Sequence, residues 1–187
     1  FVTGGLTEDG RYLLIATARG SDNNNRLYYA DLGNPKKPDL SAPVRPLFED
    51  DDAEFAPVGS RGSTLFLRTD RGAPNRMIVA VDVRRPSAWK TIVAESPHVI
   101  ESAILAGGRL FIEHLVDVKS RLGMFDLVGK PLGEVPLPAA GSISAFFGRG
   151  DASTFFYAFT SHLYPTTVFS YDIASGASEP FERAKPP

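Results

Sequence analysis

The chain has 187 residues, with 20 lysines and arginines against 22 aspartates and glutamates, so its formal net charge is -2. A nucleic-acid-binding module of this size is usually strongly basic, so composition does not indicate a nucleic acid as partner. Hydrophobic residues make up 43% and charged residues 22% of the chain, which indicates a folded protein with a sizeable core.

The absence of cysteine excludes disulfides, thiolate nucleophiles and Cys-ligated metals. No apolar run approaches the roughly 18 residues that a membrane-spanning helix requires, so we expect no membrane partner. The first residues show no basic and then apolar segment of the kind found in signal peptides, and we expect the chain to begin inside a longer gene product. The expected protein is soluble, and the cytoplasm and the periplasm both stay open as its compartment.

Seventeen glycines and 15 prolines predict many turns and therefore many short strands. One pattern of four apolar runs recurs four times along the chain. A turn glycine precedes the second run, an aspartate stands near the end of the third, and a Gly or Pro precedes the fourth. The first repeat has Phe1–Leu6, Gly10, Asp31 and Val44–Phe48. The second has Phe55–Val58, Gly62, Asp82 and Trp89–Val93. The third has Val99–Leu105, Gly108, Asp126 and Leu132–Leu137. The fourth has Ile143–Phe147, Gly150, Asp172 and Ala177–Phe181.

Four short antiparallel strands in each repeat of about 45 residues are typical of a β-propeller blade. We therefore predict an all-β chain that forms a single β-propeller segment over residues 1–187, with about four blades of four antiparallel strands. The expected blades cover approximately residues 1–50, 51–95, 96–138 and 139–187. A β-sandwich or another repeat architecture is the alternative.

The sequence predicts no catalytic residue, cofactor or metal of its own. Each recurrent aspartate is expected to accept hydrogen bonds from the backbone of the following turn. There is no Gly-x-Ser-x-Gly nucleophile elbow and no phosphate-binding glycine loop. We interpret the acidic run Glu49–Asp52, with Glu54, as a solvated connection rather than a calcium loop.

The links between the second and third runs of each repeat are rich in polar and charged residues. They cover residues 19–25, 69–75, 116–120 and 161–165. In a propeller these links share one face with the connections between blades, and binding residues concentrate on loops that a rigid scaffold holds in place. This face is where we expect function.

These loops and their neighbours closely resemble the propeller domain of prolyl oligopeptidases. The segments that carry the resemblance are Glu8–Leu13, Asn25–Leu32, Thr69–Arg76, His114–Ser120 and Phe159–Pro165, in the family's order. The resemblance covers nearly the whole chain. It implies the last four blades of a seven-bladed propeller that covers a serine-peptidase domain of α/β-hydrolase fold, which cleaves short peptides after proline.

Three residues of this chain match substrate-lining positions of the family. The resemblance places Phe1 at an apolar position of the substrate pocket and Ser21 at a small pocket-lining residue. The family's substrate-binding arginine falls on Ala18, with Arg19 in the adjacent place. Neighbouring residues of a strand point to opposite sides, so a shift by one place would turn the Arg19 side chain to the side opposite to that of the family's arginine.

The resemblance implies a gating fragment that is not catalytic by itself. Its partners would be the α/β-hydrolase catalytic domain of the parent chain, which is absent here, and proline-containing peptides. Blade faces left open by the missing blades would favour a homodimer or a rearranged ring closure. The alternative function is a free-standing β-propeller binding or assembly module without enzymatic activity.

Overall fold

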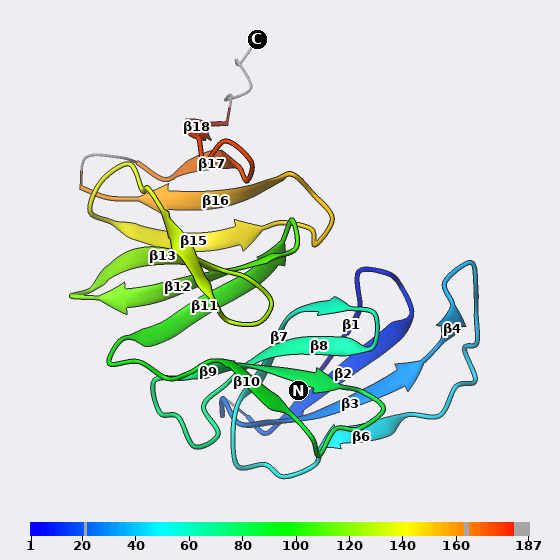
Figure 1. Cartoon of the computed structure of the whole chain (residues 1–187). Coiled ribbons are helices and arrows are strands. Elements are labelled where there is room, and N and C mark those ends of the chain that lie inside the picture. The colour runs from blue at the N-terminus through cyan, green and yellow to red at the C-terminus, as the bar shows by residue number, and fades with distance from the viewer. Residues whose placement is uncertain (21, 163–164, 182–187) are drawn as a thin grey trace. The chain divides into compact units, whose positions relative to one another are not determined.

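The computed structural model describes residues 1–20, 22–162 and 165–181 (Figure 1). Over these ranges the chain consists of strands joined by turns and loops, and they include no helix that could cross a membrane. The all-β prediction is confirmed. The chain divides into two compact units, Phe1–Pro97 and His98–Pro187, and each contains two four-stranded antiparallel sheets.

The first unit contains two sheets, each made of strands that pair with their neighbours along the chain. The first sheet has the order β1 (Val2–Leu6), β2 (Tyr12–Ala18), β3 (Asn25–Asp31) and β6 (Arg45–Phe48). The second sheet consists of β7 (Phe55–Arg61), β8 (Thr64–Thr69), β9 (Met77–Asp82) and β10 (Lys90–Val93), again in chain order.

A small hairpin that the sequence analysis did not predict is inserted in the first sheet, between β3 and β6. It pairs β4 (Gly33–Asn34) with β5 (Lys37–Pro38). Each strand has only two residues, so no alternating pattern of apolar and polar side chains could have indicated it.

The second unit repeats the arrangement of the first. Its sheets are β11 (Val99–Ala106), β12 (Arg109–Val116), β13 (Lys119–Phe125) and β14 (Pro131–Val135), then β15 (Ser142–Phe147), β16 (Thr154–Thr160), β17 (Thr167–Asp172) and β18 (Ser178–Pro180). The sixteen long and short strands of the four sheets correspond to the sixteen apolar runs of the sequence.

Each unit buries a core between its two sheets. In the first unit Tyr12 and Leu14 of β2 are buried with residues of β8 and β9, and Phe48 stacks on Phe55 with ring centroids 4.0 Å apart. In the second unit aromatic rings from β12, β16 and β17 form the corresponding core. Alternate residues of a strand point to opposite faces, so the face of the first sheet that carries Leu13 lies outside the core of its unit.

The recurrent aspartates have the role that the sequence predicts. The backbone N–H groups of the following turns donate to Asp31, Asp82, Asp126 and Asp172 at 2.7 to 3.0 Å. Three of the four turn glycines also have positive φ, at Gly10, Gly62 and Gly108, where a side chain would be strained. Gly150, in the connection between β15 and β16, is not among the positive-φ residues.

The prediction of a polar loop over residues 116–120 is wrong. Strand β12 continues to Val116 and β13 begins at Lys119, so the connection is a two-residue turn. Both turn residues, Asp117 and Val118, have positive φ, at 48° and 58°. This is the geometry of a tight hairpin turn, which is usually built from Asn and Gly, and the Asp-Val pair therefore did not indicate it.

Candidate functional site

Two of the three predicted site residues meet at one corner of the first sheet. The Ala18 backbone N–H donates to the Phe1 carbonyl at 3.0 Å, and the Phe1 nitrogen donates to the Ala18 carbonyl at 2.7 Å. Arg19 is the next residue along the chain, so its backbone lies beside that of Phe1. Ser21, the third predicted residue, lies outside the described residues.

Both side chains at this corner are presented to solvent. Phe1 is 82% exposed, and the Arg19 side chain is 79% exposed. The Arg19 Nε atom lies 3.3 Å from an Asp51 carboxylate oxygen, and Arg26 reaches the same oxygen at 3.9 Å. Asp51 therefore holds the Arg19 guanidinium from one side and leaves most of it accessible to a hydrogen-bond acceptor.

The neighbouring loop is held by a second arginine. Arg71 lies after β8 and pairs with Asp50 at 2.9 Å and with Asp52 at 2.8 Å. Its guanidinium also lies over the Phe55 ring, 5.6 Å from the centroid. The hydrogen bond from Arg71 to Asp52 is the largest cause that raises the pKa of this arginine. The arrangement fixes the link between the first two sheets against the loop between β8 and β9.

Glu54 forms the most buried of the ion pairs around this link. One of its oxygens lies 2.5 Å from Arg68, and the other lies 3.1 Å from the Nε atom of Arg76. The Glu54 backbone N–H donates to an Asp70 carboxylate oxygen at 2.8 Å. The three ion-paired side chains are at most 20% exposed, so solvent screens these pairs less than the pair of Arg19.

The acidic run was predicted to be a solvated connection, and Glu49, Asp50 and Asp52 are indeed exposed, whereas Asp51 and Glu54 are partly buried. Four of its five carboxylates pair with arginines, and we call the whole set the arginine–carboxylate network. Its members are Arg19, Arg26, Arg68, Arg71, Arg76, Asp50, Asp51, Asp52 and Glu54. Sequence reasoning missed the arginines because they come from separate parts of the first two sheets: Arg26 from β3, Arg68 from β8, and the others from the connections that follow β2 and β8. Their proximity depends on how the two sheets pack.

A polar clasp lies next to the corner. Asn25, the first residue of β3, accepts a hydrogen bond from the Phe55 N–H at 2.6 Å and donates to the Phe55 carbonyl at 3.0 Å. Its own N–H donates to the Ala53 carbonyl at 3.0 Å. The side chain thus satisfies the backbone where β7 begins, and it fixes the acidic link relative to β3.

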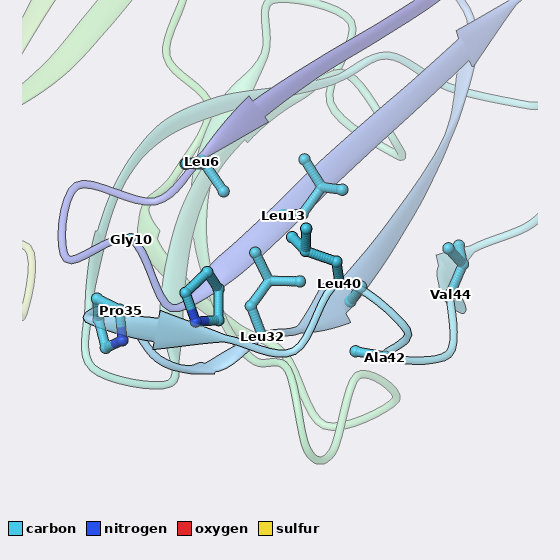
Figure 2. A pocket seen from close by; sticks show the side chains of 10 residues that line it. Leu6, Gly10, Leu13, Leu32, Pro35, Leu40, Ala42 and Val44 are labelled. Atoms are coloured by element: carbon cyan, nitrogen blue, oxygen red, sulfur yellow. The ribbon is translucent and has the colours of Figure 1, made fainter.

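A second feature of the first unit is an apolar hollow of about 470 Å³ on the outer face of the first sheet (Figure 2). Leu6, Leu13 and Leu32 line it from the sheet side, and Leu40 and Val44 come from the segment after the β4–β5 hairpin. Leu40 and Leu6 are 86% and 61% exposed. Sequence reasoning did not reveal the hollow, because five of its lining residues, between Pro35 and Val44, belong to the unpredicted hairpin and the segment after it.

A family model described as the prolyl oligopeptidase N-terminal β-propeller domain matches residues 1–184. The chain is 33% identical to the prolyl endopeptidase of Elizabethkingia miricola, over 99% of this chain and 25% of that protein. It is 32% identical to the prolyl endopeptidase of Elizabethkingia meningoseptica, over 96% and 25%. The chain therefore spans about a quarter of the length of these relatives.

Solved structures give the same result for the fold. A structure from a study of two prolyl endopeptidases, concerned with inter-domain dynamics in catalysis and specificity, matches 97% of this chain and 27% of its own with a TM-score of 0.88 and 34% identity. The apo form of prolyl oligopeptidase B from Galerina marginata matches with a TM-score of 0.85 at 17% identity, which is a similarity of fold alone. The predicted β-propeller fold is confirmed, and the four sheets are its blades.

Proposed function

The chain belongs to the prolyl oligopeptidase family, within its N-terminal β-propeller domain, and from this premise we propose that it is the non-catalytic part of a serine endopeptidase that cleaves short peptides after proline. The observation that carries the proposal is the family match over residues 1–184. The sequence contains no Gly-x-Ser-x-Gly elbow, so the nucleophile, its histidine and its aspartate would come from an α/β-hydrolase domain of the longer protein.

Within this role, the corner formed by Phe1 and Arg19 lines the path of the substrate, and Ser21, which lies outside the described residues, belongs to the proposal through the family resemblance alone. The exposed Phe1 ring offers an apolar surface to a peptide side chain, and the Arg19 guanidinium offers donors to a peptide carbonyl. Asp51 acts as the positioning residue, because it holds Arg19 through Nε only. The departure at Ala18 moves the family's arginine by one residue, to Arg19, which directly follows the last residue of β2.

The arginine–carboxylate network supports a gating role. It ties two links on one side of the first unit to the start of β7, so the loops around the corner resist displacement. A rigid rim admits short, flexible peptides and turns away folded proteins, which cannot thread past it. We also propose that the blades meet near residues 50, 95 and 138. The longer enzyme would be soluble, in the cytoplasm or the periplasm.

We also propose that the 187-residue chain by itself forms a homodimer. The support is the exposed apolar hollow on the outer face of the first sheet, lined by Leu6, Leu40 and Val44. In the longer protein, other parts of the propeller would cover such a face, and in the isolated chain a second copy is the partner with matching chemistry.

The experiment that tests the corner uses the full-length protein and a series of proline-containing peptides. Arg19→Ala should raise KM about tenfold and change kcat less than about twofold, because it removes a charge-assisted hydrogen bond to bound substrate. Arg19→Lys should recover part of the loss. Arg121→Ala is the matched control, since Arg121 is an exposed arginine in the second unit that pairs with Glu134.

The outcomes separate the levels of the proposal. An unchanged KM in Arg19→Ala would refute the role of the corner and leave the peptidase assignment intact. Cleavage that does not fall as peptides lengthen toward folded proteins would refute the gate. A full-length product without proline-specific cleavage would favour the free-standing binding module instead.

A further inference from the structure

A second cavity of the first unit lies at the end of β2 opposite to Arg19. Its volume is about 240 Å³, and Tyr12, Tyr29, Asp31, Arg45 and Arg84 are among the residues that line it. Tyr12 is the first residue of β2 and Arg19 follows the last one. At about 3.3 Å per residue the two positions lie roughly 20 Å apart, so this cavity is separate from the corner described above.

The Tyr12 hydroxyl is the unusual group of this cavity. The side chain is fully buried, and its hydroxyl oxygen has no hydrogen-bond partner within the described part of the chain. Buried hydroxyls are almost always hydrogen-bonded, because an unpaired one loses its solvation without compensation. Burial, and then the Asp31 carboxylate, raise the pKa of Tyr12, so the group stays protonated and can donate.

The charges around the cavity favour an anion. Arg11 binds both oxygens of Asp31, at 3.0 and 2.9 Å, and Arg84 binds both oxygens of Asp82 at the same distances. The two carboxylates are therefore already neutralised. Arg45 is absent from the ion pairs of the described residues, so its positive charge is in excess at the rim.

We propose that this cavity binds a small oxyanion, a carboxylate or a phosphate, with the Tyr12 hydroxyl donating to one oxygen and the guanidinium groups of Arg45 and Arg84 donating to the others. An apolar ligand would leave the hydroxyl unpaired, and a cation would meet the excess charge of Arg45. Since one water takes about 30 Å³ in the liquid, the cavity has room for an ion of a few heavy atoms and not for a polypeptide segment.

Calorimetric titration of the purified chain at constant ionic strength tests the proposal. The probes are inorganic phosphate and N-acetylglycine, with N-acetylglycinamide as the neutral counterpart of the second. Heat with phosphate alone identifies free phosphate as the source of the oxyanion, and heat with N-acetylglycine alone identifies a peptide carboxylate. Binding of neither probe, or equal binding of the amide, overturns the proposal.

Variants then locate the binding. Tyr12→Phe should weaken binding about tenfold without lowering the stability of the ligand-free protein, because no hydrogen bond within the protein is lost. Tyr157→Phe is the matched control: its buried hydroxyl donates to Ser178 at 3.0 Å, so the variant should lose stability and keep full binding. Arg45→Gln should also weaken binding. Tyr12→Phe binding as tightly as the unmodified chain would overturn the proposal.

Discussion

At the scale of single residues, aspartate carboxylates at strand ends hold the turns that follow. Each of the four recurrent aspartates accepts backbone hydrogen bonds, and two of them also bind an arginine side chain. These contacts favour the ionised form, so the pKa values of Asp31, Asp82 and Asp172 are lowered. The stabilisation that these carboxylates give to the turns after the third strands is therefore lost as the pH falls.

Asp82 provides the sharpest test of this dependence. Hydrogen bonds from Arg84 hold the pKa of Asp82 well below its usual range, so its stabilising effect is complete at neutral pH and is lost as the pH falls below about 4. Asp82→Asn should lower the free energy of unfolding by at most about 1 kcal/mol at pH 7, since the pair is partly exposed, and by less at pH 2.5. Urea unfolding at the two pH values measures the difference. The same loss in the free energy of unfolding at both pH values would contradict the role given to the ionised Asp82. Arg84→Gln should show the same dependence on pH as Asp82→Asn.

Val118 occupies an unfavourable backbone conformation. It is a β-branched residue at a φ of 58° and is 82% exposed, so it is strained and makes little compensating contact. Val118→Gly should raise the free energy of unfolding by about 1 kcal/mol, because a left-handed conformation costs a non-glycine residue about that much. Thermal unfolding checks this. Val128→Gly, at an exposed turn valine without positive φ, is the control and should not gain stability.

At the scale of elements, the same kind of clasp joins successive strands in three places. Asn25 binds the backbone of Phe55, Ser120 accepts a hydrogen bond from the Ile143 N–H at 2.8 Å, and Asn75 donates to the Ser96 carbonyl at 3.0 Å. Phe55 and Ile143 lie at the start of the first strand of the next sheet, and Ser96 lies in the link before such a strand, so each clasp binds the region where the next sheet begins. The clasps supply hydrogen bonds to backbone groups that no strand pairing satisfies.

Asn25→Ala should remove two hydrogen bonds to partly buried backbone groups at once. We expect a loss of about 2 kcal/mol in the free energy of unfolding, because the Phe55 N–H and carbonyl would lose their partners. Asn34→Ala is the control: Asn34 accepts one hydrogen bond, from the exposed Lys36 N–H, and should cost less than about 0.5 kcal/mol. Equal losses in the two variants would show that the clasp is not what holds the link.

The elements were predictable from the sequence where the cause is local. Gly10 and Asp31 punctuate turns through their own backbone and side-chain chemistry, and the second run between them alternates as a half-buried strand does. The arginine–carboxylate network was not predictable, because Arg71 meets Asp50 and Asp52 only after β8 has packed beside the first sheet. The Phe1–Arg19 corner came from family resemblance, and local chemistry alone would not have singled out either residue.

At the scale of the whole chain, the outer face of the first sheet carries an exposed apolar hollow. Leu6, Leu40 and Val44 expose apolar side chains around one hollow, whereas the opposite face of the same sheet is buried in the core of the first unit. The proposed homodimer would use this face.

Self-association of the isolated chain should therefore depend on the hollow. Leu40→Asp should shift the chain from dimer to monomer, because it places a charge at the most exposed apolar side chain of the hollow. Sedimentation equilibrium over a range of concentrations measures the shift. Val128→Asp, at another exposed apolar residue outside the hollow, should leave the dimer unchanged. A chain that is monomeric before any substitution would refute the proposed dimer.

The most direct test of the proposed function is a comparison of peptide cleavage by the purified 187-residue chain and by the full-length protein. The substrate is a fluorogenic peptide with a single proline, assayed with and without a covalent serine-peptidase inhibitor. A non-catalytic propeller segment predicts no cleavage and no inhibitor labelling for the chain alone, and inhibitor-sensitive cleavage after proline for the full-length protein. Inhibitor-sensitive cleavage by the chain alone, or none by the full-length protein, would contradict it.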